Sequence, residues 1–221
     1  MKQRTLFRPV GVRELELILD SDARRFPARL PEQPIFYPVL TCEYAEQIAR
    51  DWNTRDPRSG FAGFVTEFEV NGEYIDRFET KVVGARQHQE IWVPATELPE
   101  FNSQLRSRIR TAEAFYGRGY KGPEPLPLIV RVAEPRAQLK VLSQTLEYSG
   151  FDFLCELSAN WKLILANYGF WAACPVDQQG LSTEEAGRTL AAIVQGWRQK
   201  DLPLPTGQLA FQSPPTTGIP V

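Results

Sequence analysis

The chain has 221 residues, enough for one large domain or two small ones, and its 43% hydrophobic and 24% charged residues are ordinary for a folded globular protein. Its 25 basic and 27 acidic residues nearly balance, which excludes a general electrostatic attraction to nucleic acid or to a lipid surface, but not specific binding to either. The three cysteines, Cys42, Cys155 and Cys174, form no CxxC pair and the chain has one histidine, so we expect neither a metal site nor a disulfide framework.

The amino-terminal residues MKQRTLFRPVG lack the apolar core of a signal peptide. No apolar run approaches the roughly 20 residues of a membrane span. We therefore expect a cytoplasmic protein with reduced thiols and no membrane partner.

The first elements predict a strand, a helix and a second strand. Residues 5–10 (TLFRPV) are typical of a strand, and apolar residues at positions 12, 15, 18 and 19 then form one face of a helix. Residues 35–40 (IFYPVL) predict the second strand, with Pro38 at an edge or a bulge. Thr41 is expected to cap the helix that follows.

The next residues add strands. The alternation within residues 61–70 predicts a strand, and Asn71-Gly72 after it predicts a hairpin turn. Residues 74–83 predict a helix or a strand, a short helical piece follows around residues 97–105, and residues 109–116 predict an edge strand or a short helix. Residues 1–116 are therefore expected to form an α+β domain with a mixed sheet.

The composition changes after this domain. Residues 117–127 (GRGYKGPEPLP) are the predicted linker, and residues 128–202 are predicted to form a small, mainly helical module. Within it we expect a strand at 128–132, helices in 136–173 with a break near Ser149, and a helix capped by Thr183. Residues 203–221 are expected to be a disordered tail.

The aromatic residues of the helical module recur at helical spacing, which predicts a small core. An alternative is that Trp171, Cys174 and Asp177 form an exposed surface that docks a partner protein or a target.

The only histidine, His88, stands two residues before Glu90 at the start of a short predicted strand, residues 90–93. Side chains alternate along a strand, so His88 and Glu90 share one face while Gln89 and Ile91 share the other. Such a pair can bind a polar ligand through hydrogen bonds. The alternative is two solvated groups at a surface strand end.

Arg8 lies near the end of the first strand, where Gly11 would let the backbone approach a ligand closely. A guanidinium there can clamp a phosphate or a carboxylate, although an arginine solvated at a strand end is the alternative. Phe36 and Tyr37 point to opposite faces of the second strand. We expect one of them to pack in the core and the other to line a groove.

An arginine on the first strand, an aromatic residue on a middle strand and a glutamate on a late strand resemble the ADP-ribosyltransferase fold, in which these places bind and activate NAD. Residues 1–116 more closely resemble a family of small bacterial proteins labelled ADP-ribosylation/crystallin J1. The resemblance is carried by LFRPVGVRELELIL, PARLPEQPIFYPVLTCEYAEQIARDWN and QHQEIWVPATELPEFN. The crystallin J1 label also covers helical ADP-ribosyl hydrolases that hold two magnesium ions with aspartate clusters. This chain has no such cluster, so the transferase meaning fits better.

The resemblance implies roles for the residues above. Glu90 would accept a hydrogen bond from the nicotinamide ribose and stabilise the cationic charge that develops there. Arg8 would hold a phosphate or ribose of NAD beside Gly11, and Phe36 or Tyr37 would stack against nicotinamide. His88 stands where many transferases carry glutamate or glutamine, and it could act as a general base.

We therefore expect a mono-ADP-ribosyltransferase-like protein that uses NAD as substrate and modifies an unknown protein or nucleic-acid acceptor, with the helical module choosing the target. A catalytically silent binding protein, such as an immunity or antitoxin-like partner, is the first alternative. An NAD glycohydrolase that uses Glu90 with water as the acceptor is the second.

Overall fold

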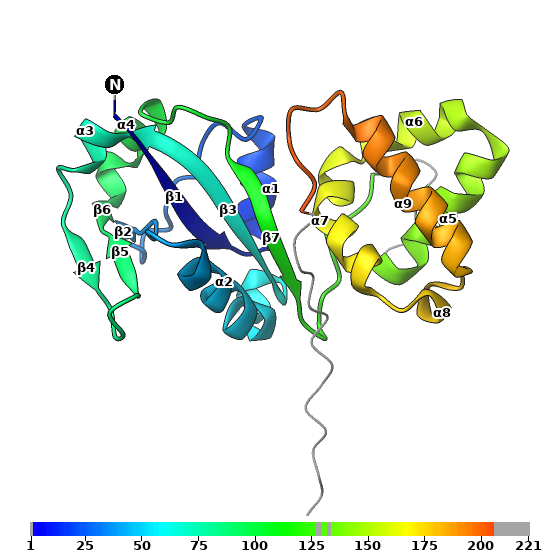
Figure 1. The fold of residues 1–221 in the computed structure, drawn as a ribbon, viewed down its shortest axis with the longest axis horizontal. Helices are drawn as coiled ribbons and strands as arrows, with labels where there is room; N and C mark the ends of the chain where they lie inside the picture. The colour runs from blue at the N-terminus through cyan, green and yellow to red at the C-terminus, as the bar shows by residue number, and fades with distance from the viewer. Residues whose placement is uncertain (1, 127–129, 132–133, 206–221) are drawn as a thin grey trace, which may run out of the picture.

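The computed structural model describes residues 2–126, 130–131 and 134–205. Strands with short helices make up the chain as far as Tyr116, and helices dominate after residue 134 (Figure 1). The predicted mixture of a strand-containing first half and a helical second half is therefore confirmed. The sheets are small, and every strand pair among the described residues is antiparallel, so the prediction of a mixed sheet was wrong.

Three strands form the central sheet, β1 (Gln3–Val10), β3 (Ala62–Asn71) and β7 (Arg110–Tyr116). Their order is β1-β3-β7, and both pairs are antiparallel. The predicted strands at 5–10 and 61–70 are confirmed, and β7 is the edge strand that was one of two predictions for residues 109–116.

One residue joins this sheet to the strand that carries Glu90. Val39 pairs with Phe7 of β1 on one side and with Glu90 on the other. Glu90 belongs to β5 (Gln89–Ile91), which pairs with β4 (Thr80–Val82). The hairpin formed by β4 and β5 therefore lies beside β1 in space, with the short extended segment around Val39 between them.

A helix covers each face of the sheet. On one face, Leu15 and Ile18 of α1 (Val12–Asp20) belong to the same buried cluster as Leu6 and Val10. On the other face, α2 (Cys42–Asp51) forms a separate cluster. The members of that second cluster are Val39, Tyr44, Ala45, Ala49, Val65 and Phe115.

Local capping signals were correct for α2. The Thr41 hydroxyl accepts a hydrogen bond from the backbone N–H of Tyr44 at 3.3 Å, as predicted for an N-cap. The prediction of one strand over residues 35–40 was wrong. Only Ile35–Phe36 (β2) pair with Val93–Pro94 (β6). Pro38 has no N–H to donate and interrupts the ladder, and beyond it Val39 pairs with Phe7 and Glu90 instead.

The predicted hairpin turn at Asn71-Gly72 was also wrong. The Asn71 side chain accepts a hydrogen bond from the N–H of Glu73 and begins one helical turn, α3 (Gly72–Ile75). Asparagine caps a helix as readily as it enters a turn, so the dipeptide alone does not discriminate. The remaining short elements of this half are η1 (Asn53–Arg55), η2 (Pro57–Ser59), η3 (Ala95–Glu97) and α4 (Leu98–Ser103).

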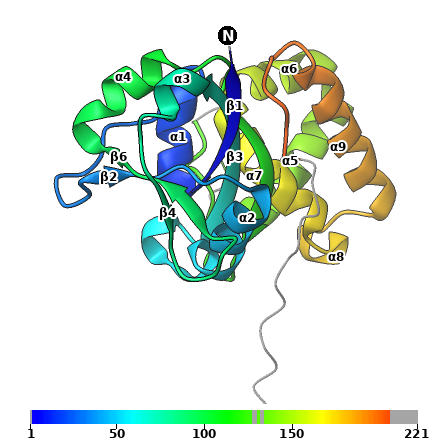
Figure 2. The ribbon, with the colours of Figure 1, turned by 60° about the vertical axis from the view of Figure 1, so that its left-hand side comes forward.

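Helices α5 to α9 build the second half, on the side of the central sheet opposite β2 and β6 (Figure 2). They are α5 (Pro135–Tyr148), α6 (Gly150–Ala159), α7 (Trp161–Ala173), α8 (Val176–Gln179) and α9 (Thr183–Trp197). The break near Ser149 is confirmed. The cap of α9 is Ser182 and not Thr183, and Glu185 completes a capping box with it.

Phe153, Phe170, Trp171 and Trp197 lie in the core as predicted, whereas Phe151 was predicted there and is exposed. The docking surface built on Trp171 and Cys174 was wrong. Trp171 is 1% exposed and Cys174 is 3% exposed, and the Trp171 indole N–H donates to the carbonyl of Pro135 at 2.8 Å. The exposed aromatic residues are instead Tyr148 and Phe151.

The two halves pack on each other. The Tyr116 hydroxyl at the end of β7 donates to the carbonyl of Ala166 in α7 at 2.8 Å. Tyr120, within the segment predicted as a linker, is buried and also donates to Ala166. Most of the strand predicted at 128–132, and most of the tail predicted at 203–221, lie outside the described residues.

Gly63 sets how closely α2 approaches the sheet. A Cβ atom at position 63 would lie 2.3 Å from the carbonyl oxygen of Ala49 in α2. Gly63→Ala is therefore expected to push α2 away and to destabilise the protein by about 1–3 kcal/mol. Urea unfolding measures this change. Gly187→Ala in α9, where a Cβ meets nothing within 4 Å, is the control and should not destabilise the protein.

Candidate functional site

Glu90 is held on the α2 face of the sheet by two donors. Its carboxylate accepts hydrogen bonds from the Tyr44 hydroxyl at 3.0 Å and from the Trp92 indole N–H at 2.8 Å. The residue is 8% exposed, so the alternative of a solvated strand end is wrong for Glu90. Burial, together with the hydrogen bond to Glu90 and the charge of that carboxylate, raises the pKa of Tyr44, which keeps the hydroxyl protonated as a donor.

His88 lies on the same face as Glu90, as the alternation predicts. Its ring stacks on the Tyr44 ring with centroids 4.4 Å apart and an interplanar angle of 12°. The Nε2 atom of His88 is 3.0 Å from the side-chain oxygen of Gln47 in α2. Tyr44 thus contacts both residues of the predicted pair, one through its ring and the other through its hydroxyl.

Arg8 is buried in an ion pair, and the alternative of a solvated arginine is wrong. Its Nε and Nη2 donate to the two carboxylate oxygens of Glu14 at 2.8 and 3.2 Å, and its Nη1 donates to the Tyr37 carbonyl at 3.3 Å. Its side chain is 3% exposed. Burial lowers the pKa of Arg8, but the Glu14 ion pair and the charges of Tyr37 and Glu90 more than offset this and raise the pKa above its usual value.

A second buried arginine shares the same carboxylate. Nη1 of Arg29 lies 3.7 Å from Glu14 Oε1, and the Arg29 side chain is 9% exposed. Among the described residues no group accepts a hydrogen bond from its buried Nε. Burial and the neighbouring Arg8 lower the pKa of Arg29. Two buried cations therefore face one carboxylate, which leaves excess positive charge and an unsatisfied donor.

The side chains of Arg8 and Glu90 start from opposite faces of the sheet. Phe7, Val39 and Glu90 are paired across antiparallel strands, so their Cβ atoms point to one face. Arg8 follows Phe7, and its Cβ points to the other face. The charge of Glu90 is the smallest of the effects that raise the pKa of Arg8.

Of Phe36 and Tyr37, one packs in the core, as expected. Phe36 is fully buried, with its ring centroid 4.9 Å from those of Phe26 and Phe101. Tyr37 is half-buried, and the Arg8 guanidinium lies 5.2 Å from the centre of its ring. Of the two aromatic residues proposed to stack on a ligand, Tyr37 is therefore the accessible one.

Gly11 contacts the protein's own backbone. A Cβ at this position would lie 2.6 Å from the Cα of Ser59 in η2. The packing of η2 against the start of α1 is enough to account for a glycine here, without a ligand.

Four residues of the site escaped the sequence-based prediction, namely Glu14, Arg29, Tyr44 and Trp92. Trp92 could have been found, because it stands two residues after Glu90 on the same strand face. Tyr44 recurs with Ile48 and Trp52 at helical spacing, a pattern that indicates a helix face and gives no sign of a contact with Glu90. Arg29 lies in an irregular loop, and no local pattern marks it as buried.

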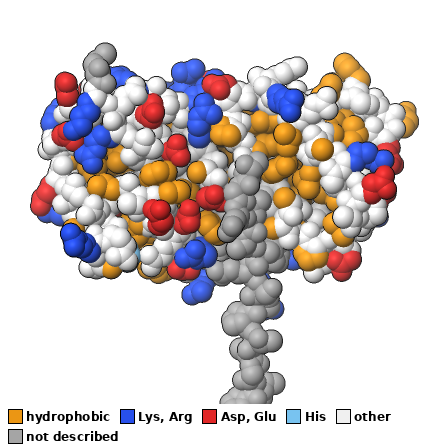
Figure 3. Space-filling view, in the orientation of Figure 1, with side chains coloured by type: hydrophobic (Ala, Val, Ile, Leu, Met, Phe, Trp, Pro, Cys, Tyr) orange, Lys and Arg blue, Asp and Glu red, His pale blue; other side chains and the backbone are white. Residues whose placement is uncertain are grey.

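Within the described ranges, no group of three His, Cys, Asp or Glu residues could hold a metal ion. None of the helices described is both long enough and apolar enough to cross a membrane. On the face drawn in Figure 3, acidic and basic side chains are interspersed over the amino-terminal half, as the balanced charge of the chain would suggest.

Comparisons with protein-family models, with curated proteins and with solved structures found no match to this chain.

Proposed function

We propose that the amino-terminal half binds NAD and acts as an ADP-ribosyltransferase-like protein. NAD would supply the ADP-ribosyl group, with nicotinamide as the leaving group. The observation that carries this proposal is the charge deficit at Arg8, Glu14 and Arg29, where two buried guanidinium groups share one carboxylate. A pyrophosphate would supply the missing negative charge and the missing acceptor for Arg29 Nε.

In this proposal Glu90 stabilises positive charge that develops on the substrate ribose. The Tyr44 and Trp92 hydrogen bonds hold the carboxylate in one orientation before the substrate binds, so no reorganisation is needed during reaction. Tyr37 offers the half-buried ring for stacking. His88 lies on the same face as Glu90 and would act on the acceptor, which is a protein or a nucleic acid.

A second candidate function is a catalytically silent binding protein. It is favoured by the opposite directions of the Arg8 and Glu90 Cβ atoms and by the two hydrogen bonds that already occupy the Glu90 carboxylate. In that case the arginine pair binds an anion and Glu90 only stabilises the contact between α2 and β5.

Arg29→Met separates ligand binding from folding. The substitution removes a buried cation that has no carboxylate of its own, so we expect little loss of stability but an affinity for NAD at least tenfold weaker, as for the loss of a charged hydrogen bond. Isothermal titration calorimetry of the full chain with NAD measures the affinity. Arg13→Met, at an exposed position of α1, is the matched control and should bind like the unmodified protein.

The same titration tests the proposal itself. An absence of heat with NAD for the unmodified protein would exclude the transferase and the glycohydrolase together. If NAD binds, release of nicotinamide without label on any acceptor identifies hydrolysis, whereas binding without release identifies the silent protein.

A further inference from the structure

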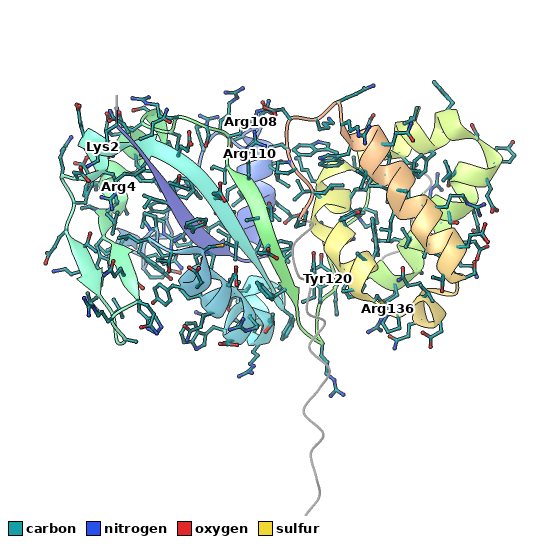
Figure 4. All side chains as sticks on the ribbon, viewed as in Figure 1. Lys2, Arg4, Arg108, Arg110, Tyr120 and Arg136 are labelled. Atoms are coloured by element: carbon teal, nitrogen blue, oxygen red, sulfur yellow. The ribbon has the colours of Figure 1, made fainter. Side chains whose placement is uncertain are left out.

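A separate hollow lies where the chain leaves β7 and meets the helical half. Its volume is about 150 Å³, and Tyr120, Phe170, Arg136, Arg118, Lys121 and Glu134 are among the residues that line it. Figure 4 labels Tyr120 and Arg136, which lie near each other at this junction. The hollow shares no lining residue with the Glu90 and Arg8 groups.

The lining carries excess positive charge. Arg118, Lys121 and Arg136 are cationic, and Glu134 is the one carboxylate, whereas the whole chain has a net charge of -2. None of these three cations forms an ion pair within 4.0 Å with a carboxylate of the described residues. A concave surface with unpaired cations attracts anions.

Arg136 adds a buried donor to this lining. Its Nε is buried and has no hydrogen-bond partner among the described residues. The Arg136 guanidinium also forms a hydrogen bond with the Cys174 side chain. That hydrogen bond does not involve Nε. Buried donors are normally satisfied by protein, by water or by a ligand.

The wall of the hollow is fixed before any ligand binds. A Cβ at Gly117 would lie 1.9 Å from the carbonyl oxygen of Thr54, and one at Gly119 would lie 2.6 Å from the Phe61 ring. These glycines therefore pack tightly against the amino-terminal half. The Tyr120 hydroxyl donates to Ala166 of α7 at 3.2 Å and holds the same turn against the helical half. The backbone that carries Arg118 and Lys121 is therefore already ordered, which reduces the entropy lost when an anion binds.

We propose that this hollow binds a single phosphate group, either as inorganic phosphate or as the phosphate of a small phosphomonoester. A hollow of this volume suits one tetrahedral oxyanion better than a whole dinucleotide. Arg136, Lys121 and Arg118 supply positive charge and donors for the oxygens of such a group. This site does not depend on the function proposed for Glu90.

The test is a titration of the full chain, by isothermal calorimetry, with inorganic phosphate and in parallel with glycerol 3-phosphate, against sodium chloride of equal ionic strength. We expect saturable heat with at least one of the two phosphate probes. Saturable heat with inorganic phosphate would show that the free ion is enough for binding. Saturable heat with glycerol 3-phosphate alone would show that the hollow binds a phosphomonoester and not the free ion. No saturable heat with either probe overturns the proposal.

Arg136→Met should weaken phosphate binding by at least tenfold and leave the response to NAD unchanged. Lys140→Met, at an exposed position of the same helix, is the matched control and should bind phosphate like the unmodified protein. If Arg136→Met does not fold, as judged by circular dichroism, Lys121→Met serves in its place with the same expected direction. If the folded Arg136→Met or Lys121→Met protein binds phosphate as tightly as the Lys140→Met control, phosphate does not bind in this hollow.

Discussion

Glu90→Gln is expected to lower the rate of nicotinamide release from NAD by about 100-fold or more, the usual cost of removing one preorganised electrostatic group from an active site. Glutamine has the size of glutamate and can still accept a hydrogen bond from Tyr44 or Trp92. The substitution therefore removes the charge and leaves the packing of α2 against β5 in place. Release of nicotinamide, followed under conditions in which NAD saturates the protein, measures the effect.

The matched control is Glu79→Gln, which removes a carboxylate from an exposed residue just before β4 in the same hairpin. It should release nicotinamide at the rate of the unmodified protein. If Glu90→Gln is as active as this control, Glu90 has no part in the reaction. A loss of NAD affinity at an unchanged rate would instead show that Glu90 acts only in binding.

The largest effect on stability is expected from Glu14→Gln, which should destabilise the protein by about 3–5 kcal/mol, as for the loss of one partner from a buried ion pair. The Glu14 carboxylate accepts two hydrogen bonds from Arg8 and lies next to Arg29, and the two arginine side chains are 3% and 9% exposed. Without this carboxylate, two like charges remain buried side by side. Urea unfolding at neutral pH gives the change in the free energy of unfolding.

Glu16→Gln, on the same helix, is the control for Glu14→Gln. Glu16 pairs with Arg13 at the surface, where an ion pair contributes at most about 1 kcal/mol. If the two substitutions have equal effects, the charge of Arg8 is balanced elsewhere, and the charge deficit on which the NAD proposal rests does not exist. If Glu14→Gln is strongly destabilising and NAD at a saturating concentration restores part of the stability, the ligand supplies the missing charge.

Several features could be predicted from the sequence because they depend on neighbouring residues. The apolar spacing in α1 defined the helix, Thr41 capped α2, and the alternation along β5 placed His88 and Glu90 on one face. Each of these follows from helix or strand geometry over a few residues.

The wrong predictions arose where one residue type serves two local structures. Asn71 is compatible with a turn and with a helix cap, and the contacts of α3 with its surroundings decided between them. Trp171 and Cys174 were proposed as exposed, but burial depends on which helices pack over a residue, and spacing along one helix does not specify that.

The sequence by itself determined helix α1, the cap of α2, strands β1 and β3, and the shared face of His88 and Glu90. Only the tertiary structure decided that Arg8 is buried, that Glu14 and Arg29 surround it, and that its Cβ points away from the face of Glu90. The physical reason is that a buried charge is balanced by groups brought together from distant parts of the chain. Such pairings follow from the packing of whole elements, and no periodicity within one segment encodes them.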